Sequence, residues 1–183
     1  MRLTRHTQPL AGAFLPFALL GSTCGPTTPQ GTGTVQFVLE TSDRTTPLFI
    51  RVALDNAQPG WISVTHASGA PVYLVARCDI GDCRSPAAVC GAAVPVVRDI
   101  SSAGSVEFVW DGNGSVLDAT TGCERRSKAA EGAYVARFCH ARAATQTGAG
   151  NSTAGMQGAL VNRVCADVRF TLPGATTVRH RVP

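Results

Sequence analysis

The sequence predicts an all-β chain folded as an antiparallel sandwich. From residue 34 onward, apolar and polar residues alternate with a period of two, and short runs rich in Gly, Pro, Asn and Ser separate these segments. No stretch has the 3.6-residue apolar period of a convincing helix. Short strands at this density, without intervening helices, favour an antiparallel sandwich over a parallel sheet covered by helices.

Eight segments are predicted strands. In chain order they are TVQFVLE (34–40), LFIRVAL (48–54), GWISVTH (60–66), PVYLVAR (71–77), AAVPVV (92–97), GSVEFVWD (104–111), GAYVARFCHA (132–141) and ALVNRVCADVRFTL (159–172). The segment CERRSKAAEGA (123–133) comes nearest to a helix and is expected to form a turn or two at most. Its basic cluster, 124–128, is interpreted as a solvated loop because it contains Glu124 and no aromatic residue.

The alternation assigns faces to the last two predicted strands. In 132–141, one side carries Tyr134, Ala136, Phe138 and His140. In 159–172, the predicted core face consists of Leu160, Val164, Ala166, Val168 and Phe170. If the two strands are neighbours, Cys139 and Cys165 both lie on the outer face and can form a cross-strand disulfide, worth roughly 3 kcal/mol.

The segments around these strands complete the expected organisation. The stretch ATQTGAGNSTAGMQG (144–158) is predicted to be a long loop, either a binding loop or a silent connection. We expect a signal peptide at 1–23, a Thr/Gly/Pro tether at 24–33, the sandwich at 34–173 and a C-terminal tail at 174–183.

The N-terminus has the order of a secretory signal. Arg2 and Arg5 precede a mostly apolar run, LAGAFLPFALL (10–20), and small residues follow it. The run is shorter than the roughly twenty residues that a membrane-spanning helix requires. The segment is therefore predicted to direct export without acting as an anchor helix.

Cys24 follows three small residues, Gly21, Ser22 and Thr23. This arrangement resembles the lipobox of bacterial lipoproteins, in which a dedicated peptidase cuts before the cysteine and the thiol carries diacylglycerol. The resemblance implies a lipid anchor on Cys24. Because Gly25 takes the place of the Asp that retains enterobacterial lipoproteins at the inner membrane, it also implies an outer-membrane position. The alternative is an ordinary cleaved signal, with Cys24 left free or removed.

The seven cysteines support the same interpretation. Setting Cys24 aside leaves six for three disulfides in an oxidising compartment: Cys78, Cys83, Cys90, Cys123, Cys139 and Cys165. We favour one bridge within 78–90 and one from that loop to Cys123. A zinc site is disfavoured because the spacings lack Cys-x-x-Cys and the setting is oxidising.

The segment VEFVWDGNGSVLDATTGCERRSKAAEGAYVARF (106–138) resembles the end of the immunoglobulin-like domain of bacterial flagellar-hook-capping proteins. There, a strand ending in Trp-Asp-Gly is followed by a glycine-containing loop and a strand with Gly-x-Tyr. The matching positions here are Trp110, Asp111, Gly112, Gly132 and Tyr134. The resemblance implies an immunoglobulin-like sandwich, with structural and not catalytic roles for these residues.

Catalytic and metal-binding patterns are weak. Three histidines follow the predicted signal, His66, His140 and His180, and the sequence has no G-x-S-x-G, H-E-x-x-H or phosphate-loop motif. DGNGSVLD (111–118) offers oxygen ligands for calcium from Asp111, Asn113, Ser115 and Asp118. It lacks the Gly and Glu of an EF-hand loop and is interpreted as a turn after a strand.

These observations predict a non-enzymatic binding or structural protein of the cell envelope, with no cofactor or metal. The net charge of +4 is too small and too scattered to indicate a nucleic-acid partner, so an envelope protein or glycan is expected. One alternative is a secreted inhibitor of an extracellular enzyme, whose contact loop would be 78–90 with Arg84 and Pro86. A hydrolase using His66 or His140 is the other.

Overall fold

The structure is a computed structural model that describes residues 33–52, 59–75, 95–117, 120–153 and 155–183. The expectations for the signal, Cys24, most of the tether and the loop 78–90 lie outside these residues. The described residues form thirteen strands and no helix, which confirms the all-β class. Accordingly, none of them belongs to a helix long and apolar enough to cross a membrane.

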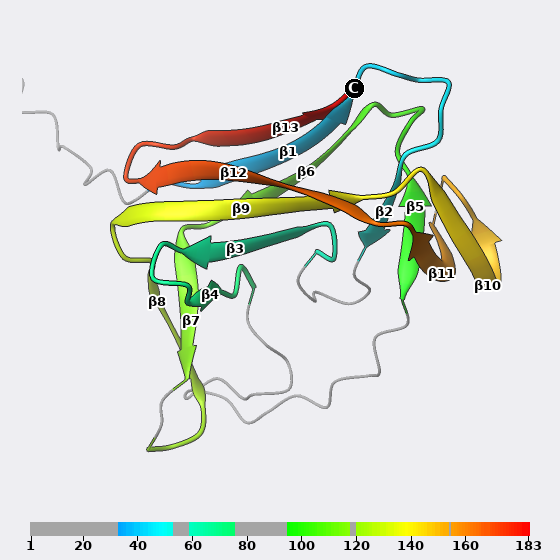
Figure 1. The fold of residues 1–183 in the computed structure, drawn as a ribbon. Coiled ribbons are helices and arrows are strands. Elements are labelled where there is room, and N and C mark those ends of the chain that lie inside the picture. The colour runs from blue at the N-terminus through cyan, green and yellow to red at the C-terminus, as the bar shows by residue number, and fades with distance from the viewer. Residues whose placement is uncertain (1–32, 53–58, 76–94, 118–119, 154) are drawn as a thin grey trace, which may run out of the picture. The chain divides into compact units, whose positions relative to one another are not determined.

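The strands form three sheets and one two-stranded ribbon (Figure 1). The β1 sheet has the order β13 (Thr177–Val182), β1 (Val35–Thr41), β6 (Ser105–Trp110). The β9 sheet has the order β12 (Val164–Leu172), β9 (Gly132–His140), β3 (Ile62–His66), β4 (Pro71–Val72). The β5 sheet has the order β10 (Ala143–Asn151), β11 (Gly155–Val161), β5 (Val96–Asp99), β2 (Phe49–Val52). The ribbon pairs β7 (Asn113–Leu117) with β8 (Glu124–Lys128).

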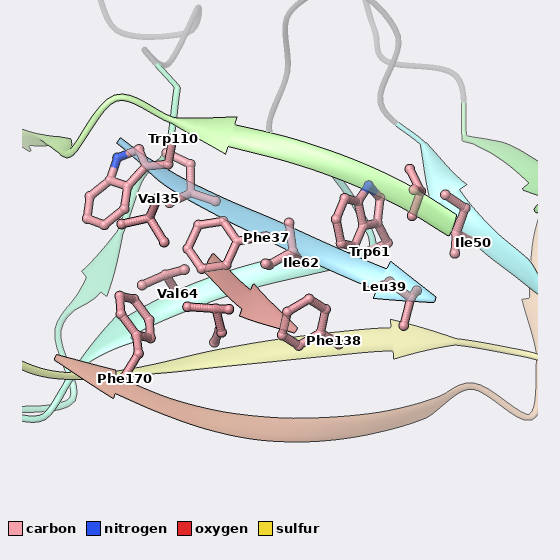
Figure 2. Close-up of a cluster of buried hydrophobic side chains, with 14 of the residues drawn as sticks. Val35, Phe37, Leu39, Ile50, Trp61, Ile62, Val64, Trp110, Phe138 and Phe170 are labelled. Atoms are coloured by element: carbon pink, nitrogen blue, oxygen red, sulfur yellow. The ribbon is translucent and has the colours of Figure 1, made fainter. Parts of the chain in front are cut away.

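The β1 sheet and the β9 sheet pack face to face as a sandwich. Phe37 of β1 lies at the centre, with its ring centroid 6.4 Å from that of Phe138 and 5.7 Å from that of Phe170. The ring centroids of Trp110 on β6 and Tyr134 on β9 are 6.3 Å apart. Figure 2 shows the side chains of Phe37, Trp110, Phe138 and Phe170 pointing into one apolar layer between the sheets. Edge-to-face aromatic pairs of this kind add specificity to the hydrophobic burial that drives the packing.

The β5 sheet continues the fold at one end of the sandwich (Figure 1). Phe49 of β2 forms an antiparallel bridge with Ala141, directly after β9, through hydrogen bonds of 2.8 and 2.9 Å. Ile50 is fully buried and belongs to the main core cluster. The β5 sheet is thereby fixed to the sandwich through β2.

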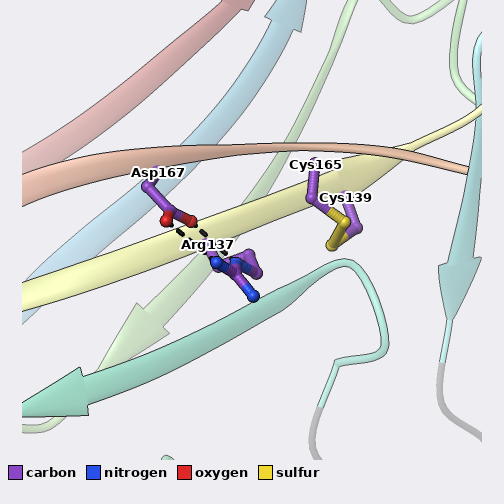
Figure 3. Close-up of a disulfide and its surroundings, with 4 residues drawn as sticks. All are labelled: Arg137, Cys139, Cys165 and Asp167. Atoms are coloured by element: carbon purple, nitrogen blue, oxygen red, sulfur yellow. Dashed lines mark hydrogen bonds and ion pairs between the residues drawn. A yellow bond between two sulfur atoms is a disulfide. The ribbon is translucent and has the colours of Figure 1, made fainter. Parts of the chain in front are cut away.

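The pairing of β9 with β12 confirms the predicted cross-strand disulfide (Figure 3). Cys139 and Cys165 are directly opposite in the antiparallel register, with their Cα atoms 4.1 Å apart. Two residues earlier on β9, Arg137 donates to both carboxylate oxygens of Asp167, at 2.7 and 2.9 Å. The predicted inner face of β9 is also confirmed, because Tyr134, Ala136, Phe138 and His140 are all buried.

The expectation of a C-terminal tail at 174–183 is wrong for most of that segment. Residues 177–182 form β13, which pairs in parallel with β1. Val178 and Val182 are each 3% exposed, and both belong to the core cluster. Glu40 of β1 accepts hydrogen bonds from Arg179 and Arg181, at 2.7 and 2.8 Å. Alternating buried valines and charged partners explain why this strand is ordered against the sandwich.

The single strand predicted at 159–172 is two strands. The chain turns at Asn162, whose φ is +52°, so that β11 ends at Val161 and β12 begins at Val164. Leu160 therefore lies in the β5 sheet, and Val164 is 56% exposed. Only the later part of the predicted core face, ending at Phe170, faces the sandwich interior.

Two predicted loops are strands instead. Most of 144–158 forms the antiparallel hairpin of β10 and β11. The basic cluster 124–128 forms β8, which pairs with β7. Four of the five residues of β8 are exposed, so the prediction of a solvated segment was correct although the prediction of a loop was wrong. These segments lack apolar alternation in the sequence. Backbone hydrogen bonds between β10 and β11, and between β7 and β8, stabilise them as strands.

Candidate functional site: a cleft in the β5 sheet

A cleft of about 410 Å³ opens on the β5 sheet and is a candidate binding site formed by residues that the structure describes. It is lined by Arg51, Pro95, Val97, Gly158, Ala159, Leu160 and Arg163. Its walls come from β2, the start of β5, β11 and the turn that leads into β12. A cleft supported by three paired strands is held in a fixed shape, whereas a cleft between loops is not.

Strand register determines which side chains line this cleft. Arg51 of β2 is paired with Val97 of β5, which places both on the same face of the sheet. Val97 is also paired with Met156 of β11. A guanidinium and an aliphatic wall are therefore held next to each other by the main-chain hydrogen bonds of three strands.

Gly158 allows β10, β11 and β5 to approach closely at the cleft. A Cβ atom at this position would lie 1.9 Å from the carbonyl oxygen of Thr145 and 3.3 Å from a methyl group of Val97. The Gly158 amide donates to the carbonyl of Pro95 at 3.1 Å. Only glycine permits this approach, and Gly158 adds no side chain to the lining of the cleft.

The cleft contains two arginines whose charges are not neutralised by the described residues. Within the described ranges, neither Arg51 nor Arg163 has a hydrogen-bond or ion-pair partner. Arg126, Arg137, Arg179 and Arg181, in contrast, each pair with a carboxylate. The two cleft guanidiniums are thus available to an anion from outside.

The Trp-Asp-Gly and Gly-x-Tyr positions come together as a structural unit. The Trp110 indole N–H donates to the carbonyl of Asn113 at 2.7 Å, and the Asp111 carboxylate accepts from the Asn113 amide at 3.0 Å. Gly112 has a φ of +75°, which favours glycine in this turn. The Tyr134 hydroxyl donates to the carbonyl of Ala130. These contacts close the turn between β6 and β7 and anchor the start of β9.

Of the calcium ligands considered in 111–118, the Asp111 carboxylate is engaged in other contacts, whereas the Ser115 hydroxyl is buried without a hydrogen-bond partner. Arg126 lies 3.0 Å from each carboxylate oxygen of Asp111. Asp118 falls outside the described residues. Within the residues that the structure describes, no group of three His, Cys, Asp or Glu side chains is placed to hold a metal ion.

His66 makes a local contact. Its Nδ1 lies 2.9 Å from the hydroxyl of Ser68 and accepts a hydrogen bond from the Ser68 amide at 3.2 Å. Its ring packs edge-on against Tyr134 at 5.0 Å. Because Nδ1 accepts the amide of a residue two positions away, the contact stabilises the turn between β3 and β4.

His140 and His180 lie together although they are 40 positions apart in the sequence. Their rings stack with centroids 6.1 Å apart, and His180 also lies 5.8 Å from Phe138. His140 is 7% exposed, and its Nδ1 has no hydrogen-bond partner. Burial lowers the pKa of His140, as do the nearby charges of His180 and Arg142, and burial lowers the pKa of His180.

Of the remaining cysteines, Cys123 is disulfide-bonded, and its sulfur lies 2.8 Å from the hydroxyl of Thr121. Cys24, Cys78, Cys83 and Cys90 lie outside the described residues. The favoured bridge within 78–90 and the favoured link from that loop to Cys123 stay predictions.

Sequence reasoning did not identify the cleft. Arg51 is a charged residue inside the apolar strand 48–54, and Arg163 is one of three charged residues in 159–172. This signal could have marked both residues, but only the pairing of β2, β5 and β11 places them at one cleft. Comparisons with protein-family models, curated proteins and solved structures found no match to the chain.

Proposed function

We propose that this protein is a lipid-anchored, non-enzymatic binding module of the cell envelope, with the cleft in the β5 sheet as its ligand site. The export signal and the lipobox-like residues before Cys24 support the location. The observation that carries the binding role is the cleft itself, which combines apolar walls with the two unneutralised arginines Arg51 and Arg163.

The chemistry of the cleft favours binding over catalysis. Its charged groups are guanidiniums, which stay protonated in proteins and therefore cannot act as general bases. Guanidiniums donate hydrogen bonds in a fixed planar geometry and are well suited to holding an anionic or polar group. Arg51 is placed by strand β2, and Arg163 by the short turn that joins β11 to β12.

Site-specific photo-crosslinking in intact cells tests the proposal. A benzophenone amino acid is placed at Ala159, which lines the cleft and is exposed. The matched control carries it at Thr171, which is exposed on β12 in the β9 sheet. We expect a discrete envelope adduct from position 159 that position 171 does not give.

The adduct is also expected to disappear when Arg163 is replaced by Gln in the Ala159 crosslinking variant. No adduct at position 159, or the same adducts at both positions, would contradict the binding role of this cleft.

A further inference from the structure

We infer that the cleft in the β5 sheet binds an organic anion with an apolar body, whose anionic head lies between Arg51 and Arg163. This inference rests on the proposed binding function and adds the chemical class of the ligand. Carboxylate and phosphate heads share the chemistry required, and the experiment below separates them.

Charge gives the first argument. The cleft holds two guanidiniums that form no ion pair with a described carboxylate, whereas Glu40 pairs with Arg179 and Arg181, Asp111 with Arg126, and Asp167 with Arg137. Two like charges that line one cleft repel each other, and an anion between them reduces that repulsion while accepting charge-assisted hydrogen bonds.

Wall composition and size give the second argument. Pro95, Val97, Ala159 and Leu160 supply an apolar surface next to the arginines. A bare inorganic ion would leave this surface in water, whereas a ligand with a hydrocarbon or aromatic body would cover it. A volume of about 410 Å³ is near the lower end for ligand sites, so a body about the size of one ring fits.

Gly60 positions one of the two guanidiniums. A Cβ atom at Gly60 would lie 2.7 Å from Cγ and 2.9 Å from Cδ of Arg51. The aliphatic stem of Arg51 therefore lies directly over Gly60, which gives the head group a defined location. A methyl group at position 60 would displace this side chain without removing its charge.

The test is a ligand titration of the full chain, purified with its disulfides oxidised and followed by backbone amide NMR. The probes are benzoate, phenyl phosphate and the neutral benzamide, which has nearly the same shape as benzoate. We expect saturable shifts of the Gly158 and Ala159 amides with one or both anions, in the millimolar range expected for such small ligands. Benzamide is expected to bind at least about tenfold more weakly than the better anion.

Variants link this binding to the two arginines. R163Q changes an exposed residue in a turn, and R51Q changes an exposed residue of β2. Each is expected to weaken anion binding about tenfold. R169Q removes the same charge from an exposed position on β12 and is the matched control, with an expected change below about twofold. G60A keeps every charge and is expected to weaken binding about threefold or more by moving Arg51.

Which anion binds decides the head group: shifts with benzoate alone identify a carboxylate, and shifts with phenyl phosphate alone identify a phosphate. The inference is overturned if neither anion causes saturable shifts, if benzamide binds as well as both anions, or if R169Q weakens binding as much as R163Q. If these results occur while the crosslinked adduct at position 159 persists, the ligand class is wrong and the binding function stands. If the adduct is absent as well, both fail.

Discussion

His140 and His180 lie where the end of β9 meets β13, in a position that disfavours positive charge. His140 is almost completely buried, its Nδ1 has no partner, and Arg142 adds a further cation nearby. In the folded protein the pKa of each histidine is lowered below its ordinary value of 6.5. The unfolded chain therefore binds more protons than the folded chain just below that pH.

The contribution of these two histidines to the free energy of unfolding is therefore expected to be fully present above pH 6.5. It should fall as the pH drops below that value, because protonation favours the unfolded chain. Urea unfolding at about pH 7.5 and pH 5 measures this difference. The double variant H140Q/H180Q should have a smaller pH-dependent loss, whereas H66Q should keep it. An unchanged loss in the double variant would show that other groups cause it.

Gly158 is expected to be intolerant of any side chain. G158A places a methyl group against the Thr145 carbonyl and should lower the free energy of unfolding by about 1 to 3 kcal/mol. G114A is the control, because the nearest atom to its Cβ would be a Val72 methyl at an ordinary 3.8 Å. Equal unfolding midpoints for the two variants in urea would contradict the close approach at the cleft floor.

Strand β13 is an element whose loss should weaken the whole sandwich. Val178 and Val182 are buried in the core, so V178A/V182A is expected to lower the free energy of unfolding by about 3 kcal/mol or more. T177A changes an exposed residue of the same strand and should have little effect. Thermal or urea unfolding makes the comparison. A double variant as stable as T177A would mean that β13 is dispensable.

The pairing of β9 with β12 is reinforced by a covalent bond. Cys139 and Cys165 are 26 positions apart, and closing a loop of this length stabilises by about 3 kcal/mol in the chain-entropy model. C139S/C165S should therefore unfold at a markedly lower urea concentration than the oxidised wild-type protein. Reducing conditions should remove the stabilisation by this bond from the wild-type protein. The variant lacks the bond and should not lose that stabilisation when it is reduced.

The sequence predicted best the elements in which alternation and burial agree. In β9, Tyr134, Ala136 and Phe138 alternate with polar residues and all face the core, as expected. Strands β7, β8 and β10 were missed because their residues are mostly glycine or polar, and their order comes from pairing across hairpins. Strand β13 was missed because its parallel partner, β1, is far from it in the sequence, at the start of the domain.

The assembly of the candidate site was not predictable from local pattern. Arg51, Val97 and Ala159 come from three strands that are distant in the sequence, and only the register of the β5 sheet places them at one cleft. The His140 and His180 pair was missed for the same reason. The Cys139 and Cys165 pair, in contrast, was predictable because two strong strands fixed both the face and the partner.

At the scale of the whole molecule, we propose that a lipid anchor on Cys24 holds the oxidised, all-β sandwich at the envelope. All three described cysteines are disulfide-bonded: Cys139 and Cys165 to each other on neighbouring strands, and Cys123 as well. The odd cysteine count is explained if Cys24 carries lipid and the other six are paired.

Intact mass spectrometry of the protein from native envelopes, before and after reduction and alkylation, tests this most directly. The account predicts a chain that begins at Cys24 with the added mass of lipid, and six thiols that become alkylated only after reduction. A mass without lipid together with a thiol that is alkylated before reduction would contradict it. The protein would then be an exported chain without an anchor.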